Sequence, residues 1–92
     1  MLDEEDKKNL ESVLKVTEED WERNFRLTRM VLNGLCKLGI DQYYYYELGH
    51  LYSSFFFTFY DDHHRTMKDD EKKEALVILT VGLKKISERN EK

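Results

Sequence analysis

The sequence predicts an all-α protein, a small bundle of four helices in a single domain that spans residues 1–92. The chain has no proline and only four glycines, so few residues interrupt a helix or supply the many turns of a β protein. Its apolar residues recur at spacings of three and four, the repeat of an amphipathic helix. A chain of this length can bury one modest core, which fits a single helical domain.

Start and stop signals divide the chain into four helical segments. These are expected over residues 3–15, 18–38, 42–66 and 69–89. Asp3 is the expected N-cap of the first segment, which otherwise carries one narrow apolar stripe. The stripe consists of Leu10, Val13 and Leu14. A weakly amphipathic helix of this kind is typical of a peripheral element or a docking arm, so the first of the four helices is a candidate for a place at the periphery of the bundle.

A helix boundary is predicted just before Thr17. Thr17 and Asp20 resemble a capping box in which Asp replaces the usual Glu or Gln, and Val16 and Trp21 occupy the two positions of a hydrophobic staple. These signals predict that one helix ends near Lys15 and that the next begins at residue 18.

The second and third helices are expected to meet at a tight corner. Gly39 is the expected left-handed C′ residue of the second helix, and Asp41 is the expected N-cap of the third. So short a connection predicts an αα-hairpin. In the fourth helix, the apolar run 76–81 (LVILTV) also fits a strand. Its flanks are helix-forming and no second strand is available to pair with it, so helix is favoured.

The third predicted helix carries ten of the twelve aromatic residues, between Tyr43 and Tyr60. At about 100° per residue they divide into two stripes on nearly opposite sides. The expected core face is Tyr44, Leu48, Leu51, Tyr52, Phe55 and Phe59. The second stripe is Tyr43, Tyr46, His50, Ser53, Phe57, Tyr60 and His64. A helix that is apolar on two sides is either covered on both by its own bundle or meets another chain, and the sequence leaves both interpretations open.

Charge and composition exclude several classes of function. A net charge of −4 and a pI near 5.4 argue against a nucleic-acid binder, which needs a basic surface. The single cysteine, Cys36, and a polar N-terminal segment without a leader pattern indicate a non-secreted, cytoplasmic protein. Apolar runs are far shorter than the ~20 residues of a membrane helix.

Two pairs of residues have the spacing of metal ligands. Glu47 and His50, and likewise Asp61 and His64, are separated by three positions, as in the Glu-x-x-His motif of di-iron bundles. Both pairs lie on one predicted helix, about 20 Å apart, so they cannot share one centre within a chain. His64 is more typical of a polar helix end. No metal, cofactor or catalytic residue is therefore expected.

The sequence thus predicts a non-enzymatic protein–protein interaction module, an acidic adaptor or an inhibitor that covers a basic surface of its target. It is expected to self-associate as a dimer through the aromatic surface of the third helix. The residues expected in this surface are Tyr43, Tyr46, His50, Phe57, Tyr60 and His64. The alternative is a metal- or small-ligand-binding bundle that uses Glu47 and His50 or Asp61 and His64.

Overall fold

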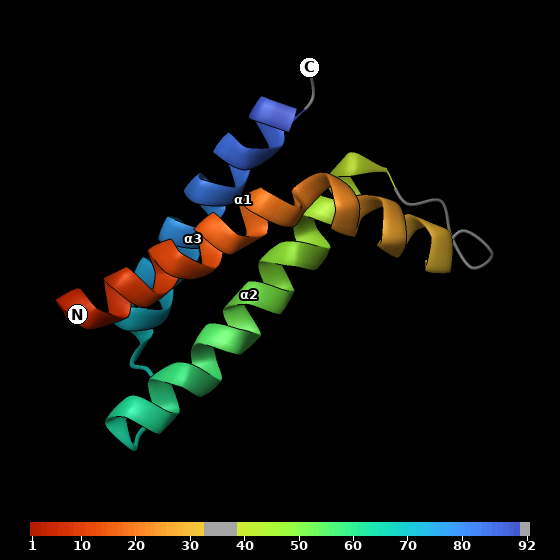
Figure 1. Cartoon of the computed structure of the whole chain (residues 1–92). Helices are drawn as coiled ribbons and strands as arrows, with labels where there is room; N and C mark the ends of the chain where they lie inside the picture. Colours follow the sequence, from red (N-terminus) through yellow and green to blue (C-terminus); the bar gives the residue numbers. More distant parts are fainter. Residues whose placement is uncertain (33–38, 91–92) are drawn as a thin grey trace.

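A computed structural model describes residues 1–32 and 39–90, and in these residues the chain forms three helices that all contact one another (Figure 1). The helices are α1 (Glu4–Leu32), α2 (Ile40–His63) and α3 (Asp69–Asn90). The chain runs out along α1, back along α2 and out again along α3 (Figure 1). The protein is therefore all-α, and the prediction of a four-helix bundle is wrong.

The error lies at Thr17, where the predicted boundary falls inside α1. The Thr17 hydroxyl donates a hydrogen bond to the Val13 carbonyl, 2.7 Å away and one turn earlier in the same helix, instead of capping a new one. No glycine or proline interrupts the chain here. Thr17 and Trp21 are buried and continue the side of the helix that carries Leu10, so one continuous helix keeps all three against the core.

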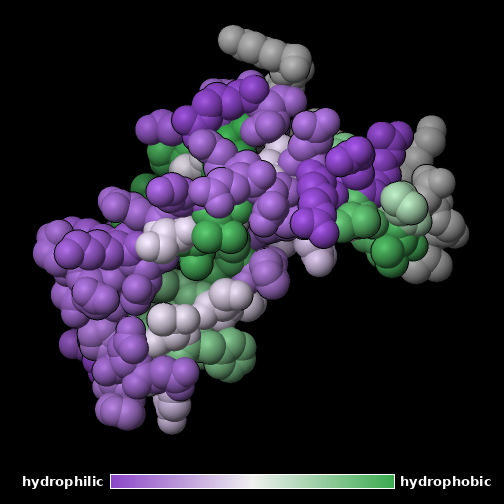
Figure 2. Space-filling model, in the orientation of Figure 1, coloured by the Kyte–Doolittle hydropathy of each residue, from purple (hydrophilic) through white to green (hydrophobic). Residues whose placement is uncertain are grey.

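The N-terminal half of α1 is also not peripheral, contrary to expectation. Leu10 and, just before the helix, Leu2 are buried in the core, and Val13 and Leu14 pack against it. The opposite side of α1 is largely hydrophilic (Figure 2). The apolar stripe does not end at residue 15, because α1 is 29 residues long and Trp21 and other side chains extend the stripe along it.

Helix ends follow the predicted signals only in part. Asp3 is confirmed as the N-cap of α1, since its Oδ1 accepts the Asp6 N–H at 2.8 Å and the Asp3 N–H donates to Asp6 Oδ2 at 3.2 Å. Gly39 is not left-handed, having a φ of −87°. Asp41 is not the N-cap of α2, because the helix already begins at Ile40, and the Gly39 N–H instead donates to Gln42 Oε1 at 3.0 Å. Positions 33–38 of the predicted second helix lie outside the described residues.

The far end of α2 and the whole of α3 are closer to prediction. α2 ends at His63, three residues before the predicted end, because His64 adopts a left-handed conformation with φ 57° and its N–H donates to the Tyr60 carbonyl at 2.8 Å. The run 76–81 is helical within α3, as expected from its flanks.

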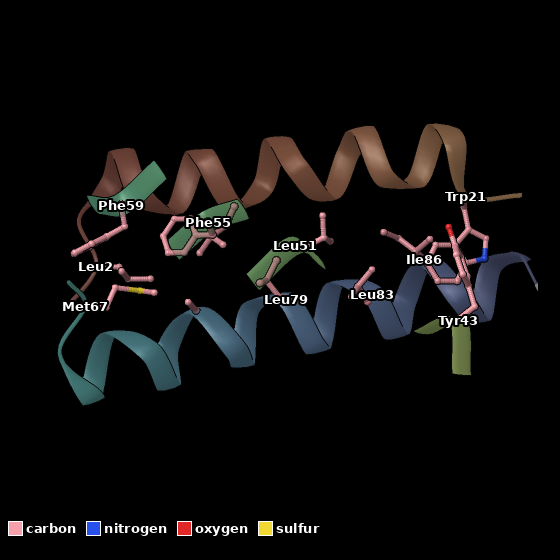
Figure 3. Packing of buried hydrophobic residues seen from close by; sticks show 12 residues of the cluster. Leu2, Trp21, Tyr43, Leu51, Phe55, Phe59, Met67, Leu79, Leu83 and Ile86 are labelled. Atoms are coloured by element: carbon pink, nitrogen blue, oxygen red, sulfur yellow. The ribbon is translucent and has the colours of Figure 1, made fainter. Parts of the chain in front are cut away.

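The core runs along the line where the three helices meet, with Trp21 and Tyr43 at one end and Leu2, Phe59 and Met67 at the other (Figure 3). The Trp21 and Tyr43 rings meet edge to face, with centroids 4.8 Å apart. The remaining buried members are Leu10, Leu51, Phe55, Ala75, Leu79, Leu83 and Ile86. Side chains from all three helices therefore contribute to one hydrophobic cluster.

The buried side of α2 differs from the predicted core face. Its buried residues follow a strict spacing of four: Tyr43, Glu47, Leu51, Phe55 and Phe59. Four residues turn a helix by about 400°, so this series winds about 40° around α2 at each step. Tyr43 of the second predicted stripe is consequently buried, whereas Tyr44, Leu48 and Tyr52 of the predicted core face are only partly buried.

Candidate functional site

The outward side of α2 carries a continuous exposed surface, here called the aromatic face. It comprises Tyr46, Gly49, His50, Ser53, Phe57 and Tyr60, all of which are exposed. The Tyr46, Phe57 and Tyr60 side chains are 51%, 68% and 49% exposed. Side chains of this size are usually covered, so their grouping on one side of one helix makes this face the candidate contact surface.

The structure brings together four of the six residues predicted to form the interaction surface. Tyr46, His50, Phe57 and Tyr60 share the aromatic face, and the His50 ring stacks on Tyr46 with centroids 6.5 Å apart. Tyr43 is fully buried, and its hydroxyl donates a hydrogen bond to Glu47 Oε1 at 2.9 Å. Burial raises the pKa of Tyr43, and the charge of Glu47 adds to this effect. Tyr43 is therefore a core residue that no partner can reach.

A shallow groove between α1 and α2 lies beside the aromatic face. Its volume is about 350 Å³. Val13 and Val16 of α1 form one wall, and His50, Leu51 and Ser54 of α2 form the other. Weakly polar and hydrophobic side chains reach the surface on this side of the molecule, below α1 (Figure 2). The groove thus extends the apolar surface of the aromatic face onto a second helix.

Except for Tyr46, the residues of the aromatic face lie in an uncharged stretch of sequence. From Leu48 to Tyr60 the chain has no Asp, Glu, Lys or Arg, although such residues make up 37% of the protein. Exposed positions on a helix in water are normally charged or strongly polar. An uncharged segment of helix with an exposed side favours contact with another apolar surface over contact with water alone.

A group of charged and polar side chains lies where α2 ends and α1 and α3 begin. His63 Nε2 lies 2.9 Å from Asp6 Oδ1 and 3.8 Å from Asp3 Oδ2. The hydrogen bond to Asp6 raises the pKa of His63, and the charges of Asp6 and Asp3 add to it, while partial burial and Arg65 oppose it. The pKa of Asp3 is lowered, chiefly by the Asp6 N–H. These contacts tie the end of α2 to the start of α1.

A similar set of contacts joins the end of α2 to the start of α3. Arg65 donates two hydrogen bonds to the buried Glu71 carboxylate, at 2.8 and 3.0 Å, and the Lys68 N–H donates to Glu71 Oε1 at 2.8 Å. The Arg65 guanidinium also lies over the Phe59 ring, 5.0 Å from its centroid. With Arg65 beside it, Glu71 has a pKa lowered to about 2.

The two pairs with ligand spacing in the sequence, which belong to the alternative metal-binding interpretation, are not the ones that the structure groups together. Glu47 is buried and accepts the Tyr43 hydroxyl, and Asp61 and His64 are exposed. Within residues 1–32 and 39–90, one group of three possible metal ligands has its donor atoms within 4.8 Å of one another. It consists of Asp3, Asp6 and His63. Their donor atoms already pair with one another and with the first N–H groups of α1, so in this arrangement they join helices.

Sequence reasoning missed this group because Asp6 and His63 are 57 positions apart. The Asp3-x-x-Asp6 pattern of a helix start is visible in the sequence, but nothing in the sequence indicates which residue from another helix will contact it.

We expect the pKa of His63 to lie above the ordinary value of about 6.5, and the substitution Asp6→Asn to bring it back towards that value. A raised pKa means that the stabilisation by this contact is complete below about pH 6.5 and is lost as the pH rises through the pKa of the folded state. An NMR titration of the imidazole measures the pKa directly. Asp62→Asn, at an exposed acid next to His63, is the control. An unchanged His63 titration in Asp6→Asn would show that Asp6 does not stabilise the imidazolium.

No family model matches the chain, and neither curated proteins nor solved structures give a match to it. Within its described residues, no helix combines the length and the apolarity needed to cross a membrane. Inference about function therefore rests on the surface chemistry of the chain itself.

Proposed function

We propose that this protein is a non-enzymatic protein–protein interaction module that self-associates through the aromatic face of α2. The observation that carries the proposal is the grouping of three exposed aromatic rings, Tyr46, Phe57 and Tyr60, on one uncharged side of a helix. Together they present roughly 300 Å² of aromatic surface. Aromatic side chains are enriched in interfaces and supply much of their binding energy.

A second copy of the chain is the partner that suits this surface. Each copy has a net charge of −4, so two copies repel each other unless they meet through a region without acidic side chains. The aromatic face is such a region. Its acidic neighbours, Asp61 and Asp62, lie beyond its end.

Other exposed apolar side chains are less suited to binding a partner. Val77 and Val81 are exposed on α3, but they are small side chains set among exposed lysines such as Lys73 and Lys84. Met30 and Val31 are exposed near the end of α1, but neither is aromatic. The aromatic face is therefore favoured by the size of its side chains and by its lack of charge.

The substitution Phe57→Glu is expected to raise the dimer dissociation constant by roughly 30-fold or more, the effect of losing an interface residue worth about 2 kcal/mol. Sedimentation velocity over micromolar concentrations measures it, with the mass of the wild type rising from 11.2 kDa towards twice that value. Because Phe57 is 68% exposed, the helical circular dichroism of the variant should match that of the wild type.

Val77→Glu is the matched control, since it places the same charge at an exposed apolar position of α3. It should leave the dissociation constant within about twofold of the wild-type value. If Val77→Glu abolishes the dimer and Phe57→Glu does not, the interface lies on α3. A wild type that stays at monomer mass at every concentration would contradict self-association.

A further inference from the structure

We infer that the second copy lies antiparallel across the aromatic face, so that Phe57 of each copy enters a gap formed by Tyr46, Gly49, His50 and Ser53 of the other. This inference rests on the proposed function and specifies how its partner is held. Three features of α2 support it: a straight seam of side chains, a gap of matching position, and the order of the two along the helix.

The seam is the repeat of a coiled coil. Its residues alternate in spacings of four and three: Tyr46, His50, Ser53, Phe57 and Tyr60. Such a repeat drifts only about 20° around a helix in seven residues, whereas the buried series at spacings of four winds about 40° at every step. The buried series meets α1 and α3. The aromatic face is a second and straighter seam, of the kind that pairs with another helix lying almost parallel or antiparallel to it.

The gap lies around Gly49. In knobs-into-holes packing, one side chain inserts among four residues of the facing helix at positions i, i+3, i+4 and i+7. Tyr46, Gly49, His50 and Ser53 have these positions. A Cβ atom added at Gly49 would meet nothing within 4 Å, so the space above it is open. Phe57, more exposed than Tyr46 and Tyr60, is the natural side chain to fill it.

The order of ring and gap along α2 selects the antiparallel arrangement. The centre of the gap precedes Phe57 by about 7.5 residues, or about 11 Å. Two parallel helices in register would place Phe57 against Phe57 and Gly49 against Gly49. An antiparallel pair with its two-fold axis near Ser53 places each Phe57 over the gap of the other copy and brings Tyr46 towards Tyr60. The two copies then use the same surface, as a closed two-fold dimer requires.

Charge and area agree with a dimer of moderate affinity. The pairing overlaps the segment from Leu48 to Tyr60, which has no charged side chain, so neither copy buries an unpaired charge there. Val16 of α1 is 59% exposed beside the groove and adds apolar area next to the seam. The aromatic surface alone is below the roughly 800 Å² per partner of a standard interface, so dissociation in the micromolar range is expected.

Filling the gap tests the arrangement without touching the core. Gly49→Leu is expected to raise the dimer dissociation constant at least tenfold, because the leucine occupies the space that Phe57 of the other copy enters. The monomer should unfold at the same or a higher temperature, since a Cβ at this position meets nothing and leucine favours helix over glycine. Thr58→Leu, exposed on another side of α2, is the matched control and should leave the dissociation constant unchanged. An unchanged constant in Gly49→Leu would overturn the inference.

Cysteine cross-linking in a Cys36→Ser background tests the direction. Ser53→Cys is expected to form a disulfide with its own copy, because the two-fold axis passes near it. Tyr60→Cys should not link to itself, since the two positions lie about 20 Å apart in the antiparallel pair. It should link instead to Tyr46→Cys in an equimolar mixture, as peptide mass analysis can show. Self-linking of Tyr60→Cys would indicate parallel helices and would also overturn the inference.

These outcomes separate the inference from the function on which it rests. If Phe57→Glu dissociates the dimer while Gly49→Leu does not, or while the cross-links are parallel, the interaction surface stands and the antiparallel gap is wrong. If the wild type is a monomer at every concentration, both fail.

Discussion

Replacing Trp21 by alanine is expected to lower the free energy of unfolding by about 3–5 kcal/mol, the usual loss when a large buried aromatic side chain is truncated. Trp21 is 2% exposed and meets Tyr43 of α2 edge to face. Its removal leaves a void where α1 crosses α2. Domains of this size are stable by roughly 5–15 kcal/mol, so the variant should be unfolded in part or fully near physiological temperature. Urea denaturation measures the change. Unfolding is followed by circular dichroism, because Trp21 is the single tryptophan and the variant therefore has no tryptophan fluorescence.

Val16→Ala is the control for this experiment. Val16 is exposed on α1, so the substitution should change the free energy of unfolding by less than about 0.5 kcal/mol. In the hydrophobic staple predicted from sequence, Val16 and Trp21 would contact mainly each other. Replacing either residue by alanine would then lower the free energy of unfolding by a similar and small amount. Equal effects of the two variants would therefore contradict the continuous helix and its packing.

The helical class could be predicted because it depends on composition and local periodicity, but the continuity of α1 could not. Thr17 and Asp20 have the residue types of a helix start, and the same residues are also tolerated in the interior of a helix. Whether a helix starts at Thr17 or continues through it depends on the packing of Thr17 and Trp21 against other helices. That contact is tertiary, and it outweighs a capping signal worth about 1 kcal/mol.

The aromatic segment shows a similar limit. The sequence indicates that α2 is apolar on two sides, and the exposure of Tyr46 and Phe57 agrees with a second apolar side. The sequence does not show that the buried residues of α2, at spacings of four, wind around the helix. This winding depends on the angle at which α2 crosses its neighbours. The sequence consequently places Tyr43 in the outer surface, although it contacts Trp21 in the core.

Long-range polar contacts were the least predictable part of the structure. The prediction of Asp3 as an N-cap is confirmed because capping depends on residues three positions apart. The contact of Asp6 with His63 depends instead on how three helix ends converge. Acidic residues at the starts of α1 and α3 and a basic residue near the end of α2 each suit the helix dipoles locally, yet which of them pair is decided by the fold.

The substitution Glu71→Gln is expected to lower the free energy of unfolding by about 2–3 kcal/mol at pH 7. Glu71 is buried, holds the Arg65 guanidinium through two hydrogen bonds and accepts the Lys68 N–H at the start of α3. Glutamine keeps one acceptor oxygen but loses the charge that pairs with Arg65. Arg65 is partly exposed and can be solvated when the pair is broken, so the expected loss lies below that of a fully buried ion pair.

The loss of stability in Glu71→Gln is expected to depend on pH, because the Glu71 carboxylate titrates. The pKa of Glu71 is lowered from its ordinary value of 4.5 to about 2 in the folded protein. Its stabilisation is therefore complete above about pH 4.5 and is lost as the pH falls towards 2. The difference in stability between wild type and Glu71→Gln should be constant between pH 6 and 8 and should shrink between pH 4.5 and 2. Urea unfolding at pH 7, 4 and 3 measures it, with Glu88→Gln at an exposed position of α3 as the control. A difference that is the same at pH 3 as at pH 7 would show that the charge of Glu71 does not stabilise the junction of α2 and α3.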